Sequence, residues 1–238
     1  MRGTRKKINI GKITVKGPLS KRVYKELKRA VLEGNFAPGE LLPEDFLTEA
    51  TGVSRTPVRE ALMRLQGEGL VKIIPRKGAR VLEMDSVELT QLVEARILLE
   101  TAFLDRAIGA IPPKKLRKIR DDMASVISEM RSLETTSSLW GKKRLEYSKL
   151  DFNFHRTLVE ATENRFLLKY YDMLLDRVII YSHHTIIKHP IYFFKSAEEH
   201  DDILHAILNG ENHMAKKLIE SHLQQLNHRL VDASAKES

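Results

Sequence analysis

The sequence predicts a mostly α-helical protein in two parts: three helices with a short antiparallel hairpin, then a bundle built only of helices. Apolar residues recur at helical spacing through most of the 238 residues. Segments of strand type, bounded by turn residues, occur near residues 69–82. From Asp85 onward, Pro, Gly, Asn and Ser/Thr signals separate apolar stripes of helical period, without strand-like alternation.

Three helices are expected before the hairpin. The first covers residues 19–33 and ends at Gly34-Asn35, a left-handed C-terminal stop. The second is short, over residues 43–51. The third starts after Ser54, whose hydroxyl can cap it by accepting a bond from a free backbone N–H of the first turn. Pro57 fits that turn, because a missing N–H costs nothing there.

The third helix has the features of a helix that reads DNA. Its inward face is apolar, and its first turn presents arginine, whose planar fork can bond guanine O6 and N7 together. Taken alone, it could equally be a capped surface helix. Two strands follow, over residues 69–74 and 79–82, around a basic turn, which completes a winged helix-turn-helix. The residues expected to contact DNA are Ser54, Arg55, Thr56 and Arg59 on the helix, with Arg76, Lys77 and Gly78 in the turn.

The positive charge of the chain is confined to this first part. Residues 1–80 carry 18 Lys and Arg against 8 Asp and Glu, whereas residues 81–238 carry 22 against 24. Binding of DNA phosphates requires such a placement. Residues 1–17 form a basic leader that we expect to be flexible.

Composition excludes several classes of protein. The chain has no Cys, so disulfides, thiolate metal sites and cysteine nucleophiles are excluded. No apolar run is long enough to span a bilayer, and no apolar signal core follows the basic N-terminus. We therefore expect a cytoplasmic protein with no membrane partner.

Six helices are expected in the second half, over residues 85–109, 113–133, 139–162, 164–187, 191–209 and 211–232. A bundle of this size usually carries its site in its interior. The apolar stripes place four chemically active side chains inward or at the stripe edge: Asp151 and His155 on the third helix, His200 on the fifth and His222 on the sixth. Asp151 and His155 are four residues apart and share one face.

These four residues suit a metal ion. Such a set would be costly to bury without a common partner. Three imidazoles and one carboxylate favour Zn²⁺, Ni²⁺, Mn²⁺ or Fe²⁺. Spacing alone leaves open that the histidines are core residues with internal partners. The set also permits an enzyme, a metal-dependent hydrolase fused to a DNA-binding module. Such an enzyme needs a general base beside the metal. Asp151 would already be a ligand, so Glu100 is the one other inward carboxylate that could serve as that base.

At this point the sequence resembles the GntR family of bacterial regulators. The matching residues are Pro38-Gly39-Glu40-Leu41-Leu42, the run from Gly52 to Leu62, Gly69-Leu70-Val71 and Gly78. The second half resembles the metal-binding version of the FCD domain of the FadR-type branch, through Asp151-Phe-Asn-Phe-His155 and the segments around His200 and His222. The count of six helices favours the VanR-like version over the one with seven.

The resemblance implies an organisation and a function. The expected parts are a leader over 1–17, a winged helix-turn-helix over 18–82, a linker over 83–86 and an FCD-like effector-binding and dimerisation domain over 87–234. The protein would be a transcription regulator, a repressor, that binds a palindromic double-stranded DNA operator as a homodimer. It would sense a small organic acid at the metal.

Two arginines are candidates for binding that acid. Arg96 lies among apolar residues of the first bundle helix, and the resemblance implies that it pairs with a carboxylate of the effector. Its alternative partner is an internal acid, Glu100 or Asp151. Arg177 is a second candidate, in the stripe Leu167, Tyr170, Leu174 and Tyr181. The chain also departs from some relatives, which have a basic residue that helps to read DNA where this chain has Asp45.

Overall fold

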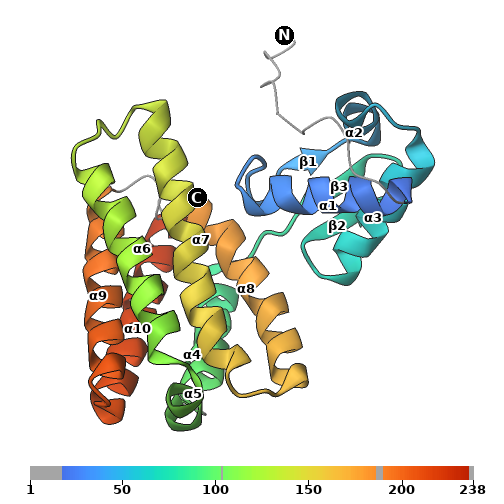
Figure 1. The fold of residues 1–238 in the computed structure, drawn as a ribbon. Helices are drawn as coiled ribbons and strands as arrows, with labels where there is room; N and C mark the ends of the chain where they lie inside the picture. The colour runs from blue at the N-terminus through green and yellow to red at the C-terminus, as the bar shows by residue number, and fades with distance from the viewer. Residues whose placement is uncertain (1–17, 103, 186–189, 236–238) are drawn as a thin grey trace. The chain divides into compact units, whose positions relative to one another are not determined.

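The structure, a computed structural model, describes residues 18–102, 104–185 and 190–235 (Figure 1). The chain forms two compact units. The first ends at Met84 and the second begins at Asp85, except that the segment Ile179–His184 belongs with the first by its contacts. The expected leader over residues 1–17 lies outside the described residues.

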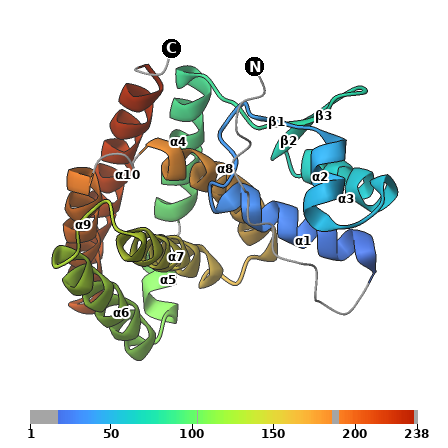
Figure 2. The same ribbon diagram turned by 90° about the horizontal axis from the view of Figure 1, so that it is seen from above.

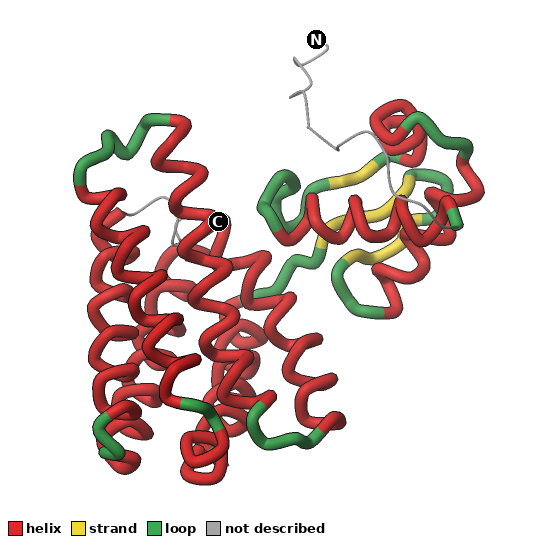
Figure 3. The backbone as a smooth tube through the Cα atoms, in the orientation of Figure 1, coloured by secondary structure: helices red, strands yellow, loops and turns green. Residues whose placement is uncertain are grey.

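The first unit combines three helices with a small sheet, whose strands are drawn in yellow in Figure 3. The elements are α1 (Leu19–Leu32), β1 (Leu41–Leu42), α2 (Glu44–Thr51), α3 (Arg55–Gly67), β2 (Val71–Ile74) and β3 (Gly78–Val81). The sheet is antiparallel in the order β1-β3-β2. Strand β1 was not expected, because two residues are too few for a period to show.

The core of the first unit follows from helical spacing. Helices α1 and α3 pack against each other. Each buries an apolar stripe: Val23, Leu27, Ala30 and Val31 on α1, and Val58, Ala61, Leu62 and Leu65 on α3. One expected detail is wrong. Ser54 is the N-cap residue of α3, but its side chain makes no capping hydrogen bond and is exposed.

The second unit contains seven helices among its described residues (Figures 1 and 2). They are α4 (Ser86–Thr101), α5 (Leu104–Ala110), α6 (Pro113–Arg131), α7 (Ser138–Glu160), α8 (Arg165–Thr185), α9 (Pro190–Leu208) and α10 (Asn212–Ala235). Helix α4 starts with a capping box, in which Asp85 and Glu88 each accept a hydrogen bond from the other's backbone N–H.

The expected single helix over residues 85–109 is wrong, because α4 ends at Thr101 and α5 begins at Leu104. No Gly or Pro marks the break. The hydroxyl of Thr101 donates to the carbonyl of Ile97 on the preceding turn at 2.8 Å, a bond that weakens and bends helices. The count of six helices, which favoured the VanR-like version, is therefore not supported.

Five helices of the second unit, α4, α6, α7, α9 and α10, surround one interior. Helix α10 packs against α4 and α9, and α7 packs against α4 and α6 (Figure 2). Large buried side chains fill this interior, among them Phe154, Tyr171, Ile203 and Leu223. Among the described residues, no helix has both the length and the apolar character needed to cross a membrane.

Candidate metal centre and nucleic-acid interface

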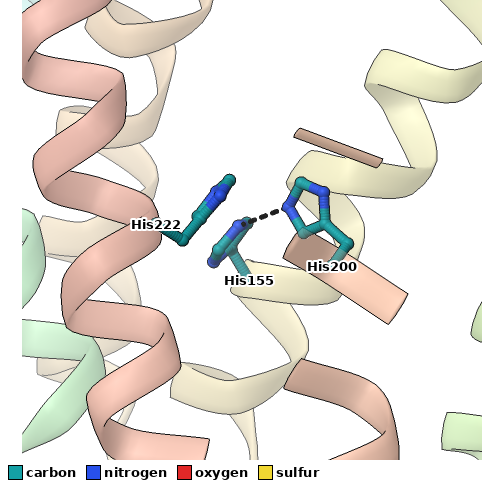
Figure 4. Close-up of side chains that lie close together, drawn as sticks. All are labelled: His155, His200 and His222. Carbon is teal, nitrogen blue, oxygen red and sulfur yellow. Dashed lines mark hydrogen bonds between the residues drawn. The ribbon is translucent and has the colours of Figure 1, made fainter. Parts of the chain in front are cut away.

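Three histidines from three helices meet in the interior of the second unit. Figure 4 shows His155 of α7, His200 of α9 and His222 of α10 with their rings close together. At most 4% of any of the three is exposed to solvent. One ring nitrogen of each lies within 4.8 Å of the other two. The structure thus brings together the three histidines that the sequence places inward, whereas His205, His213 and His228 are exposed.

Asp151 lies beside this cluster, one helical turn before His155. Its Oδ1 atom is 3.1 Å from Nε2 of His200 and 3.4 Å from Nε2 of His155, and the two Nε2 atoms are 3.0 Å apart. Ligand atoms held about 2.1 Å from one ion at angles of about 90–110° lie about 2.9–3.4 Å from one another. The three atoms fit a shared ion. Because Oδ1 of Asp151 lies this close to both Nε2 atoms, its carboxylate can be a ligand of the same ion.

The tautomer of His155 is fixed by Glu100 on α4. The ring Nδ1 of His155 donates to Oε2 of Glu100 at 2.6 Å. Burial on its own would raise the pKa of Glu100, but the charge of Arg96 and the contact with His155 hold it well below its usual value. An ionised Glu100 only accepts hydrogen bonds. Burial lowers the pKa of His155. A neutral His155 therefore carries its proton on Nδ1 and keeps the Nε2 lone pair for a cation.

His222 has the same arrangement with different partners. Its Nδ1 donates to Oε2 of Glu199 at 2.8 Å, and Nη2 of Arg229 donates to the other oxygen of Glu199 at 2.7 Å. Burial, together with the nearby His200, lowers the pKa of His222 to about 3. Nδ1 of His200 lies 3.1 Å from the hydroxyl oxygen of Tyr147, which can accept a hydrogen bond from an Nδ1–H group. All three rings can thus present Nε2 to one cation.

Arg96 of α4 is buried, with 1% of its surface exposed. Its Nε donates to Oε1 of Glu100 at 2.5 Å, so the internal partner is Glu100. Tyr171 donates to the same oxygen at 2.7 Å. Burial opposes the charge of Arg96, but Glu100 raises its pKa above its usual value. Nη2 of Arg96 is buried without a hydrogen-bond partner among the described residues. One donor therefore remains for an anion.

The structure does not place Arg177 in this cluster. Its Nη1 donates to the carbonyl of Met173 on its own helix at 2.6 Å, and no contact with the three histidines is found among the described residues. The stripe assumed for α8 is also wrong at one position, since Tyr170 is 61% exposed and Tyr171 is fully buried. Both tyrosines are compatible with the spacing from Leu167 to Leu174, and the sequence does not choose between them.

Two further residues were missed. Glu199 stands in an acidic run from Glu198 to Asp202, where only the fold decides which carboxylate faces inward. Arg229 follows His222 by seven residues, which is two helical turns. That spacing puts both on one face of α10 and could have identified Arg229.

The first unit presents the expected DNA-contacting residues at its surface. Ser54, Arg55, Thr56 and Arg59 are exposed in and before the first turn of α3, and Arg76 and Lys77 are exposed in the turn between β2 and β3. Lys77 N donates to the carbonyl of Ile74 at 3.0 Å. Arg76 has a φ of 63°, a conformation that glycine or asparagine usually supplies in such a turn. An arginine at this position therefore carries backbone strain that a glycine would avoid.

Gly78 serves the sheet. It is buried, with a φ of 117°. A Cβ atom at this position would collide with the carbonyl oxygen of Leu42 in β1. The glycine therefore lets β1 approach β3. Its burial argues against a direct contact of Gly78 with DNA.

A winged helix-turn-helix joined to a helical unit with buried histidines defines a DNA-binding regulator with a second, helical domain. The chain matches the family model described as "Bacterial regulatory proteins, gntR family" over residues 19–81 and the FCD domain over residues 91–225. The FCD match alone covers more than half of the chain. The protein therefore belongs to the GntR family, with an FCD domain, and is a transcriptional regulator and not an enzyme.

The chain is similar to proteins that are named as transcriptional regulators. The "Uncharacterized HTH-type transcriptional regulator YdhC" of Bacillus subtilis (strain 168) is 30% identical over 151 residues, 63% of each chain. The "HTH-type transcriptional repressor GlaR" of Escherichia coli (strain K12) is 26% identical, over 84% of this chain and 90% of that one. The structure of E. coli McbR/YncC has a TM-score of 0.72 at 20% identity, covering 91% of this chain and 99% of that one, and so shares the fold.

Proposed function

We propose that this regulator is a repressor that binds a palindromic operator as a homodimer in the cytoplasm and responds to a small carboxylate at the histidine cluster. Relatives that are named as repressors support the assignment of this chain as a repressor. The observation that carries the response to a carboxylate is the cluster itself. The buried His155, His200 and His222 lie together with the partly exposed Asp151, and Arg96, which is paired with Glu100, has an Nη2 without a hydrogen-bond partner among the described residues.

Asp151, His155, His200 and His222 would hold a divalent transition metal, of which Zn²⁺, Ni²⁺, Mn²⁺ and Fe²⁺ all suit three imidazoles and a carboxylate. When bound, the ion supplies positive charge and open coordination positions for an oxygen ligand. Glu100, Glu199 and Tyr147 orient the three rings, as partners of metal-binding histidines generally do.

The charges around the cluster favour an anionic effector. Arg96 and Arg229 carry two positive charges, and Glu100, Asp151 and Glu199 carry three negative ones, which leaves one negative charge. A divalent cation would change this to one positive charge. An uncompensated buried charge is costly, so one carboxylate would restore neutrality. Nη2 of Arg96 can donate to that carboxylate.

Arg177 remains a second candidate for effector binding, on the resemblance alone. Coupling to DNA requires that the effector bind one spacing of the two DNA-binding heads of the dimer better than another. The largest possible effect on operator affinity equals that difference in effector affinity. We propose that the effector changes this spacing.

Calorimetry tests the proposal. Protein loaded with Zn²⁺ is titrated with acetate, lactate, gluconate and succinate, each with and without operator DNA. We expect at least one acid to bind and to change operator affinity, and the same acid to bind far less to chelator-treated protein. The proposal is wrong if no acid changes operator affinity, or if binding is indifferent to the metal.

A further inference from the structure

Two carboxylates at the start of α2 hold the two arginines in the first turn of α3. Nη2 of Arg55 donates to Oδ1 of Asp45 at 2.8 Å. Nε of Arg59 donates to both oxygens of Glu44, at 2.9 and 2.8 Å. Both arginines belong to the surface that is expected to meet the bases, so each carries a bound carboxylate where it would approach DNA.

These pairs are not explained by the stability of the fold. The side chains of Arg55 and Asp45 are 64% and 76% exposed, and in the second pair Arg59 is 61% exposed and Glu44 is 22% exposed. Exposed ion pairs contribute little to folding. The two carboxylates also need no arginine to be stable, because negative charge is favoured in the first turn of a helix.

The pairs leave each arginine able to read a base. A guanidinium has five N–H donors. Glu44 uses only Nε of Arg59, so both Nη atoms stay available, and Asp45 uses one N–H of Nη2 of Arg55. Guanine O6 and N7 need two of the remaining donors. A guanidinium that is already held in place has less side-chain freedom to lose when it binds a base.

We propose that Asp45 is a positioning residue for Arg55, and Glu44 for Arg59, and that the two carboxylates sharpen the choice between operator and other DNA. They repel phosphates, which weakens binding that depends on the DNA backbone alone. They also hold the guanidinium groups of Arg55 and Arg59 in position to bind bases, so sequence-specific binding is preserved. The proposal rests on the assignment of Arg55 and Arg59 as base-reading residues.

The test compares two DNA duplexes with the full-length protein. One duplex is selected by the parent protein from a random-sequence library, and the other is a scrambled duplex of the same length and composition. Asp45→Asn and Glu44→Gln remove the charges with little change in shape. Glu49→Gln is the matched control, because Glu49 is an exposed acid of α2 for which no ion pair is recorded among the described residues.

The ratio of the two affinities is the first readout. We expect it to fall about tenfold in Asp45→Asn and in Glu44→Gln, within the range that one bidentate base contact provides. Part of the fall should come from tighter binding to the scrambled duplex. Glu49→Gln should keep the ratio within about twofold, since it changes the net charge equally without touching an arginine. A ratio in Asp45→Asn and Glu44→Gln that matches Glu49→Gln overturns the proposal.

Base preference is the second readout. If Asp45 only stabilised the fold, Asp45→Asn would leave the base preference unchanged. Library selection with Asp45→Asn should relax the same base pair of each half-site that Arg55→Ala relaxes. If Arg55→Ala relaxes a base pair and Asp45→Asn does not, the positioning role is wrong while the assignment of Arg55 stands. If Arg55→Ala relaxes no base pair, the assignment of the reading residues fails, and this proposal fails with it.

Discussion

Glu100 accepts a hydrogen bond from Nδ1 of His155 at 2.6 Å, in the interior of the helical unit. The other carboxylate oxygen of Glu100 accepts hydrogen bonds from Arg96 and Tyr171. One carboxylate on α4 therefore links the arginine that would contact an effector to a histidine that would hold the metal. We therefore expect a change at Glu100 to affect both metal binding and stability.

Replacing Glu100 by Gln should weaken metal binding about 10- to 100-fold, as loss of such a partner typically does. Gln no longer compels His155 to carry its proton on Nδ1, and Arg96 loses its buried counter-charge, so the melting temperature should fall as well. A competition assay with a coloured chelator measures the affinity. Glu94→Gln is the control, since Glu94 is an exposed acid of the same helix. Equal metal affinity in the two variants would refute the role given to Glu100.

Replacing Arg96 by Lys should weaken binding of the carboxylate effector about tenfold while the metal content stays near one per chain. Lys keeps the positive charge opposite Glu100 but loses the planar fork that donates through Nη2. Calorimetry with the acid identified for the parent gives the affinity, and elemental analysis gives the metal content. The same exchange at Arg177 should change effector affinity less. Unaltered effector binding in Arg96→Lys would remove Arg96 from the effector site.

The metal-free protein should lose stability as the pH falls below about 6.5. The pKa of His222 is about 3 in the folded protein and about 6.5 in the unfolded chain. Between these values the unfolded chain binds a proton that the folded protein does not, so lower pH favours unfolding. His155 acts in the same direction. Each group contributes about 1.4 kcal/mol per pH unit.

Urea unfolding of chelator-treated protein between about pH 7 and pH 5 measures this slope, above the range in which Asp and Glu titrate. His222→Gln should have a shallower slope than the parent, because one of the two titrating groups is gone. A parent protein whose unfolding free energy does not change over this range would show that the rings are not held neutral.

Arg55→Ala and Arg59→Ala should each lose about 1–3 kcal/mol of specific DNA affinity, if each arginine holds a guanine through two N–H groups. Changes at Arg76 or Lys77 should instead weaken binding to all sequences alike, as phosphate contacts do. Gel shifts with the selected and scrambled duplexes separate the two effects. An undiminished ratio of affinities in both α3 variants would show that bases are read elsewhere.

Much of the candidate site could be predicted from the sequence, because helical period decides which residues face inward. His200 and His222 lie in apolar stripes and His155 lies inward or at the edge of one, and all three are buried. His205 lies five residues after His200, about 140° around the same helix, and is exposed. The GntR and FCD family matches bear out the recognition that rested on these residues and on the motif around Arg55.

The remaining features depend on contacts that no local pattern encodes. The partner of His222 is one of several adjacent acids, and only the packing of α9 against α10 selects Glu199. The break after Thr101 is local, but it has no Gly or Pro signal, and a Thr within a helix does not by itself predict a break. The pairs of Asp45 with Arg55 and of Glu44 with Arg59 join residues 10 and 15 positions apart, across the turn between two helices.

The central claim is that Asp151 and the three histidines hold a transition metal. Elemental analysis of the full-length protein, purified without any chelator, tests it most directly. We expect about one equivalent of Zn, Ni, Mn or Fe per chain in the parent, its loss in His155→Ala and His200→Ala, and its retention in His205→Ala, the exposed histidine of α9. A parent protein without transition metal, or a metal content that His155→Ala and His200→Ala leave unchanged, would contradict the claim.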